Sequence, residues 1–120
     1  MSVDASSQQD LILQLRKFAK ERDWDKFHSP KNLSMALSVE VSELIEHFQW
    51  LTEEQTNNLN PVQKEKVEEE LADIYLYLLR LSDVLDVDLN QVAQQKIIRN
   101  AEKYPVSKSF GTSTKYTDLD

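Results

Sequence analysis

Two pairs of acidic residues have the type and spacing of a metal site. Glu40 and Glu43 stand three residues apart in one largely apolar stretch, and Glu70 and Asp73 stand three apart in another. Residues three apart lie on the same face of a helix, so each pair presents two carboxylates together. An ionised carboxylate beside a hydrophobic seam needs a cation, because burying an unpaired charge is costly. We therefore expect these four acids to bind a divalent metal between two helices.

The donor atoms predict which metal this would be. Four carboxylates offer only oxygen, which favours Mg²⁺, with Mn²⁺ as a substitute, over zinc. Magnesium keeps water and substrate phosphates as ligands, so the site is expected to be catalytic. Glu40 or Glu43 would also accept the proton of an attacking water, and the sequence does not choose between them. The alternative is that both pairs are ordinary helix surface, where this spacing is common.

The position of the acids beside apolar seams favours the metal site. With residues placed about 100° apart, Glu40 lies inside the apolar stripe of its helix and Glu43 at the edge of that stripe. Glu70 lies about 60° from the centre of a second stripe, and Asp73 lies further out on the same flank. The stripes consist of Leu33, Leu37, Leu44, Phe48 and Leu51 in one helix, and of Leu71, Ile74, Leu78, Leu81 and Leu85 in the other.

Capping residues and prolines predict the helices that carry these seams. Ser29-Pro30 and Asn60-Pro61 each place a capping side chain before a first-turn proline, and Pro105 must end the last helix. Ser6 or Ser7 and Asp88 are expected to cap the other two. With only 1 Gly in 120 residues, we predict an all-α, four-helix bundle-like domain over residues 1–105. The helices expected within it span residues 8–22, 30–51, 61–84 and 89–103, and the tail, residues 106–120, is expected to be extended or flexible.

Composition excludes several classes of function. A net charge of −7 opposes binding to a nucleic-acid polymer, and the absence of cysteine excludes disulfides and thiolate metal sites. The polar N-terminal segment lacks the pattern of a secretion signal, and nowhere do 18 apolar residues follow one another. We expect a cytoplasmic protein that does not insert into a membrane.

A second candidate site lies between the first two predicted helices. Trp24, Asp25, Lys26, Phe27 and His28 bring two aromatic rings and a histidine to a predicted loop, and binding residues concentrate on loops. The alternative is a linker whose aromatic rings only seal the end of the bundle. The residues alone leave both interpretations open.

The chain resembles a known family at these positions. Glu40-Val-Ser-Glu43 and Glu70-Leu-Ala-Asp73 match the E-x-x-E and E-x-x-D motif of the MazG-like all-α nucleoside triphosphate pyrophosphohydrolases. The resemblance is strongest to the small dCTP pyrophosphatase branch and covers about residues 11 to 105. It includes residues 21–33, His47-Phe-Gln-Trp50 and Asn100-Ala-Glu-Lys-Tyr104-Pro105, with an echo at residues 115–119.

The resemblance implies a reaction and a set of residues. Members of the family hydrolyse nucleoside triphosphates between the α and β phosphates, with Mg²⁺ bound by the four acids. The first-helix position of a pocket histidine in the eukaryotic dCTP enzymes is Leu15 here, so one polar base contact is missing. The positions that match the nucleotide pocket are Trp24, Asp25, Lys26, Phe27, His28, Trp50 and Tyr77, and those near phosphate or sugar are Lys31, Lys96 and Asn100.

The function expected from this resemblance is removal of unwanted deoxynucleotides, with dCTP or a related dNTP as substrate. A dUTPase-like or phosphoribosyl-ATP pyrophosphohydrolase activity and a non-enzymatic helical interaction module are the alternatives. The resemblance also implies a homo-oligomer, most simply a tetramer with pockets where subunits meet. The last predicted helix supports assembly, because Val92, Ala93, Ile97 and Ile98 cover a broad arc of it.

Overall fold

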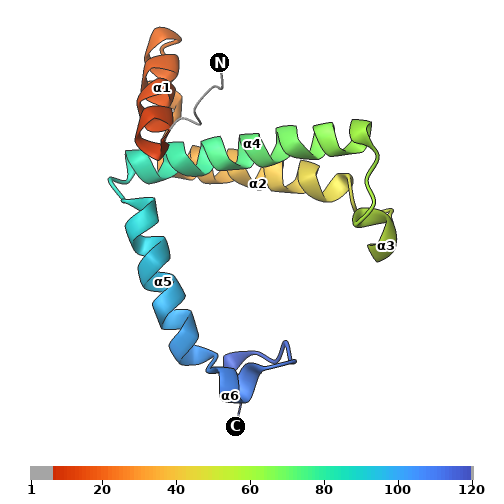
Figure 1. Ribbon diagram of the computed structural model, residues 1–120. Helices are drawn as coiled ribbons and strands as arrows, with labels where there is room; N and C mark the ends of the chain where they lie inside the picture. The colour runs from red at the N-terminus through yellow and green to blue at the C-terminus, as the bar shows by residue number, and fades with distance from the viewer. Residues whose placement is uncertain (1–6, 120) are drawn as a thin grey trace, which may run out of the picture. The chain divides into compact units, whose positions relative to one another are not determined.

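The computed structural model describes residues 7–119, and every regular element in that range is helical (Figure 1). The prediction of an all-α protein is therefore confirmed. No helix among the described residues combines the length and the apolar character that a membrane span requires. The elements are α1 (Gln8–Glu21), η1 (Asp25–Phe27), α2 (Pro30–Glu46), α3 (Glu53–Thr56), α4 (Pro61–Val84), α5 (Leu89–Lys103), α6 (Val106–Ser109) and η2 (Tyr116–Asp118).

The long helices begin where their caps predict. A side-chain oxygen of each capping residue accepts a hydrogen bond from the backbone N–H three residues later, which satisfies one of the free donors of the first turn. The donor-to-acceptor distances are 2.8 to 3.1 Å. Ser6, the other candidate cap of the first helix, lies outside the described residues. The caps are Ser7, Ser29, Asn60 and Asp88.

Helix α2 is shorter than predicted. It ends at Glu46 rather than near residue 50, and residues 47–50 form turns before the short helix α3, which the sequence analysis did not predict. A capping box explains α3: Thr52 Oγ1 accepts from the N–H of Gln55 at 3.2 Å, and Gln55 Oε1 accepts from the N–H of Thr52 at 2.9 Å. This reciprocal pair favours a new helix start over continuation of α2.

Two compact units divide the chain, Met1–Asp86 and Val87–Asp120. In the first unit α2 and α4 lie side by side along most of their lengths, and α1 packs against α4 (Figure 1). Arg16 of α1 and Asp83 of α4 tie these helices together through two hydrogen bonds of 2.7 and 2.6 Å. The buried hydrophobic residues of the described part of this unit are Ala19, Leu33, Val67 and Leu79.

The predicted seam is correct for α2 and partly wrong for α4. In α2, Leu33 is buried and Leu37 and Leu44 are half-buried, and the last two stripe residues, Phe48 and Leu51, are half-buried in the segment after the helix. In α4, Leu71 and Leu85 are half exposed, whereas Val67 and Leu79 are buried. Helix α4 packs against α1 as well as α2, so its buried residues do not follow a single stripe.

The second unit consists of α5, α6 and η2. Pro105 stands between α5 and α6, as predicted for a residue that ends a helix. The segment predicted to be extended or flexible contains the helical turns α6 and η2. Tyr116 of η2 packs edge-on against Tyr104, with ring centroids 5.9 Å apart, and Lys103 Nζ lies 4.8 Å from the Tyr116 ring centroid. These ring contacts order part of the tail.

Candidate active site

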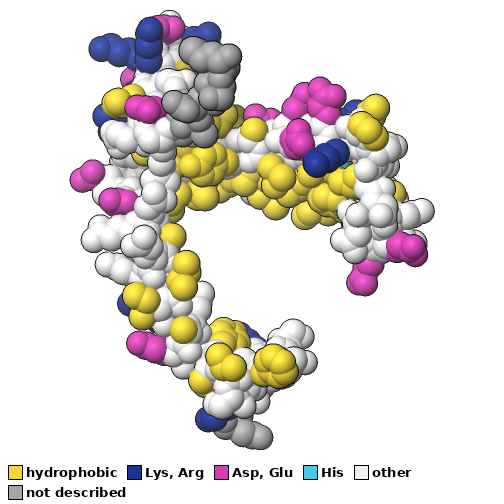
Figure 2. Space-filling model, in the orientation of Figure 1, with side chains coloured by type: hydrophobic (Ala, Val, Ile, Leu, Met, Phe, Trp, Pro, Cys, Tyr) yellow, Lys and Arg dark blue, Asp and Glu magenta, His cyan; other side chains and the backbone are white. Residues whose placement is uncertain are grey.

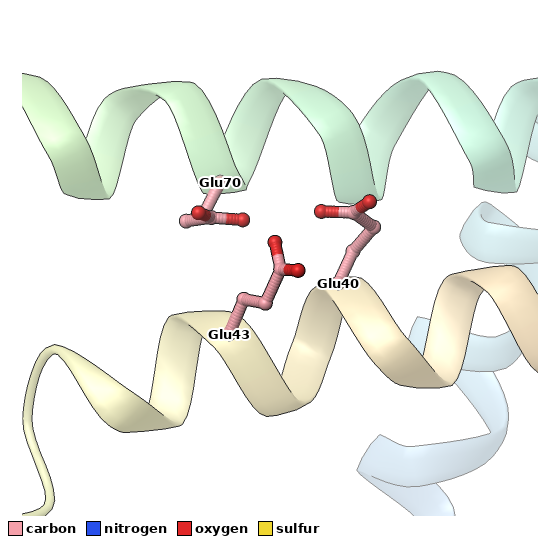
Figure 3. A group of neighbouring side chains, drawn as sticks. All are labelled: Glu40, Glu43 and Glu70. Carbon is pink, nitrogen blue, oxygen red and sulfur yellow. The ribbon is translucent and has the colours of Figure 1, made fainter.

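Three of the four predicted metal ligands meet between α2 and α4. Glu40 and Glu43 lie one turn apart on α2, and Glu70 lies opposite them on α4, so the side-by-side packing of the two helices brings them together. One carboxylate oxygen from each lies within 4.8 Å of the others. Figure 3 shows the three side chains extending into the space between the two helices. All three are half-buried.

The carboxylates lack donors that would satisfy their oxygens. Glu40 Oε2 and Glu70 Oε2 are buried and have no hydrogen-bond partner among the described residues. Burial, reinforced by the close Glu43 carboxyl group and by the charges of Glu43 and Asp73, raises the pKa of Glu40 from 4.5 to about 7. The nearby Glu70 carboxyl group acts in the same direction. Orphaned oxygens and mutual repulsion both fit a site for a divalent cation.

Two further residues border this cluster. Asp73 stands one turn after Glu70 and is exposed, yet its charge contributes to the raised pKa of Glu40. His47 Nε2 lies 3.6 Å from Glu70 Oε1. Oxygens supplied by carboxylates alone, with buried lone pairs unpaired, suit a hard cation such as Mg²⁺.

A cavity of about 520 Å³ opens beside Asp73. Its walls come from α1, α4 and the turn between α1 and α2, all within the first unit. Mostly apolar walls with a few polar groups are typical of small-molecule sites, and this volume is within their usual range. The lining residues are Leu11, Gln14, Leu15, Phe18, Trp24, His28, Asp73, Leu76, Tyr77 and Arg80.

The turn after α1 places the rings of Trp24 and His28 at this cavity. Asp23 adopts a left-handed conformation, with φ of 55°, and the Trp24 N–H then donates to the Ala19 carbonyl at 2.9 Å. The Trp24 ring meets Phe18 edge-on, with centroids 5.6 Å apart, and meets His28 in the same manner at 6.2 Å. These contacts fix the indole at the cavity wall, where it offers surface to a flat ligand.

Arg80 is a polar lining residue that the sequence did not lead us to predict. Its Nε donates to His28 Nδ1 at 3.1 Å and its Nη2 donates to Asp25 at 2.7 Å. A signal was present, because Arg80 lies seven residues after Asp73 and three after Tyr77, and therefore on the same helix face. A lone cation in the apolar run of residues 78–81 also marks the position. Gln14, another missed lining residue, carries no such signal.

The cavity brings together only some of the predicted pocket residues. Trp24, His28 and Tyr77 line it, and Asp25 reaches its edge through the bond to Arg80. Lys26 instead pairs with Asp23 at 3.0 Å. Leu15, expected to replace a polar base contact, is an apolar part of the wall.

Five further predicted residues are not part of this wall. Phe27 and Lys31 are exposed, and the Trp50 side chain is 86% exposed. Lys96 and Asn100 lie one turn apart on α5, in the second unit. The charge of Lys103, with desolvation and Arg99, lowers the pKa of Lys96, so this face of α5 concentrates positive charge.

Comparison with known proteins adds independent evidence. A curated dCTP pyrophosphatase 1 of Mus musculus is 45% identical over 105 residues, which cover 86% of this chain. The human protein of the same name is 40% identical over the same length. The aligned region spans 62% of the length of these relatives.

A solved structure and a family model agree with these relatives. The crystal structure of a pyrophosphatase from Archaeoglobus fulgidus matches with a TM-score of 0.79 and 37% identity, covering 88% of this chain and 98% of that one. The model of the MazG-like family matches residues 35–119, a range that includes the acids of both helices. The chain therefore belongs to the MazG-like family.

Proposed function

We propose that this protein hydrolyses nucleoside triphosphates between the α and β phosphates, releasing a monophosphate and pyrophosphate. The observation that carries the proposal is the pair of buried, unpartnered oxygens of Glu40 and Glu70, beside a mostly apolar cavity. The first feature fits a divalent metal and the second fits the base of a nucleotide. The names of the dCTP pyrophosphatase relatives and of the archaeal pyrophosphatase support the same chemistry.

In this proposal Glu40, Glu43, Glu70 and Asp73 hold Mg²⁺, or Mn²⁺ in its place. When bound, the ion neutralises phosphate charge and orients a water molecule. The protein's own contribution is to position the triphosphate and to accept a proton. Glu40, whose carboxylate lies among the clustered acids, would accept the proton of the attacking water. Glu43 is the alternative, and the two would compete for the same proton.

The cavity would receive the nucleobase. Trp24 offers a stacking surface, and Gln14, His28 and Tyr77 supply the polar groups that orient a ligand. We propose dCTP or a related dNTP as the substrate, in keeping with the names of the relatives. Lys31, Lys96, Asn100 and Trp50 are proposed to contact the remainder of the nucleotide, with lysines offsetting phosphate charge.

Assembly into a homo-oligomer, most simply a tetramer, belongs to the same proposal. Figure 2 shows hydrophobic side chains gathered along the α2–α4 pair. Helix α2 exposes four apolar side chains, and α5 exposes Ile97 and Ile98. Patches of this kind on a small protein favour burial against another copy. The four α2 residues are Met35, Val39, Val41 and Ile45. A cytoplasmic role in clearing unwanted deoxynucleotides completes the proposal.

A screen of pyrophosphate release tests this function. Purified protein is incubated with each canonical and several modified nucleoside triphosphates, with Mg²⁺, Mn²⁺ or chelator. The expected result is metal-dependent release, fastest with dCTP or a close relative. Fastest turnover of dUTP or of phosphoribosyl-ATP would favour the corresponding alternative activity. No release from any substrate would leave the helical interaction module, which explains the exposed apolar faces but not the orphaned carboxylates.

A further inference from the structure

Arg80 is a nearly buried cation that uses every edge of its guanidinium. Its side chain is 11% exposed. Nε donates to His28 Nδ1 at 3.1 Å, and Nη2 donates to Asp25 Oδ1 at 2.7 Å. Nη1 lies 3.6 Å from Asp83 Oδ2. Contacts on three sides hold the guanidinium plane in one orientation.

The bond from Arg80 determines where His28 carries its proton. An arginine Nε is always protonated and can only donate, so His28 Nδ1 must accept and cannot itself carry hydrogen. A neutral imidazole with an unprotonated Nδ1 carries its proton on Nε2. His28 lines the cavity, and the edge-on contact with Trp24 restrains its ring. The free polar atom of the ring is therefore a fixed N–H donor.

The charges around His28 keep it neutral. Arg16 makes a two-bond pair with Asp83, so Arg80 and Arg16 balance Asp25 and Asp83. A protonated His28 would add a positive charge to this balanced group. Burial and the charge of Arg80 lower the pKa of His28, and the charge of Asp25 only partly opposes them. Neutral His28 is thus the form present at physiological pH.

We propose that Arg80 is a positioning residue that locks His28 in the Nε2–H tautomer, so that His28 donates a hydrogen bond to the bound nucleobase. The inference rests on the proposed nucleotide hydrolysis and adds a rule for base selection. A donor that cannot become an acceptor favours a base edge that presents a ring nitrogen or carbonyl oxygen at that point. It disfavours an edge that presents an N–H there, because two donors would face each other.

The tautomer is measured directly by nitrogen NMR of the whole protein, without nucleotide. Labelled histidine is expected to show an unprotonated Nδ1 and a protonated Nε2 for His28 at neutral pH. In Arg80→Met the two tautomers should mix. A protonated Nδ1 in the unaltered protein would overturn the proposal. This measurement does not depend on whether the protein hydrolyses any nucleotide.

The functional role is tested by a double-mutant cycle on the best substrate. Arg80→Met is expected to raise KM about two- to fivefold, because only the fraction of His28 that keeps the Nε2–H tautomer still donates, with kcat nearly unchanged. In a His28→Ala background the same change should add little, because Arg80 acts through His28. Additive effects would overturn the proposal and leave Arg80 a purely structural role. Lys64→Met, the same charge change at an exposed position of α4, is the control.

A conservative variant tests how Arg80 acts on His28, and the activity screen separates this proposal from the proposed function. Arg80→Lys keeps a positive charge that can only donate, so KM and the tautomer of His28 should stay parental together, or change together if the ammonium does not reach Nδ1. A raised KM in Arg80→Lys while His28 Nδ1 stays unprotonated in the NMR spectrum would overturn the positioning role. If the unaltered protein released pyrophosphate from no nucleotide, the proposed function would fail and the donation to a base with it. The NMR result would still decide the tautomer.

Discussion

The carboxylates between α2 and α4 are more basic than their residue type implies. Three half-buried glutamates share one small space, and two of their oxygens have no donor within residues 7–119. In solution such groups would be charged and hydrated, whereas here each additional negative charge raises the proton affinity of its neighbours. Neutralising one of these glutamates should therefore lower the rate of catalysis, whereas the stability of the metal-free protein should rise because repulsion is relieved.

Replacing Glu40 by Gln should abolish most activity without unfolding the protein. The change removes a metal-binding charge but hardly any volume, so we expect at least a roughly 100-fold loss of pyrophosphate release. Circular dichroism should be unchanged. Glu46→Gln, on an exposed position of the same helix, is the matched control. Activity within about twofold of the parent at saturating Mg²⁺ would remove Glu40 from the catalytic set.

The stability of the metal-free protein should fall as pH rises from about 4.5 to about 7. Glu40 has a folded-state pKa of about 7, above its ordinary value of 4.5, so the folded state holds this proton more tightly than the unfolded chain. The stabilisation is complete below the lower value and is lost as pH rises through the upper one. Urea unfolding in chelator, on both sides of this window, measures the effect. A pH dependence that persists unchanged in Glu40→Gln would assign it to other groups.

Trp24→Ala should weaken nucleotide binding by about 1 to 3 kcal/mol through lost stacking. Binding is measured calorimetrically with a non-hydrolysable nucleotide, and Mg²⁺ binding is measured on the same samples. The metal affinity should be preserved, because Trp24 lines the cavity and is not among the clustered carboxylates. Phe110→Ala, an exposed aromatic residue of the second unit, is the control. Parallel loss of metal affinity would identify Trp24 as part of the structural core instead.

At the scale of helices, local signals predicted the starts well and the interior contacts poorly. Ser29-Pro30 and Asn60-Pro61 fix the first turns of α2 and α4, because a cap and a first-turn proline act within a few residues. Thr52-Glu-Glu-Gln55 carries the capping-box pattern of α3, so that helix was predictable too. The Arg80–His28 bond joins residues 52 positions apart, and no local periodicity contains it.

The same limit applies to the candidate site. The acids were predictable because the position of a charged residue relative to an apolar stripe can be worked out from the sequence of a single helix. The cavity wall was not, because Gln14 and Leu76 come together only when α1 packs against α4. The buried face of α4 was misplaced for the same reason, since its two neighbours cover different sides.

Leu79→Ala should destabilise the protein by about 2 to 5 kcal/mol, the usual cost of a cavity at a fully buried leucine. Chemical denaturation followed by circular dichroism measures the change. Leu13→Ala, at a half-exposed position of α1, makes the same substitution where little packing is lost. Equal destabilisation by the two changes would show that Leu79 is not part of the core.

At the scale of the molecule, the described residues bury few hydrophobic side chains completely. Four are buried, while apolar residues of α2 and α5 remain largely exposed, including Ile97 at 69% and Ile98 at 64%. A domain of this size needs more buried apolar surface than that for ordinary stability. Association between copies would supply it.

Light scattering should therefore report a mass well above the 14.0 kDa of one chain. Ile97→Lys should reduce this mass, because a charge would be buried at a contact between copies. Gln95→Lys adds the same charge at an exposed polar position of α5. A monodisperse monomer that keeps full turnover on dilution would overturn the oligomer.

Because of the unpartnered oxygens between α2 and α4, the stability of the folded protein should also depend on the concentration of free divalent metal. A folded state that binds a cation which the unfolded chain does not bind is stabilised by about 2.7 kcal/mol when the free ion exceeds its dissociation constant 100-fold. Proteases degrade proteins mainly from transiently opened states, whose population falls as this stabilisation grows. The supply of divalent metal would then govern how long each molecule persists as well as how fast it works.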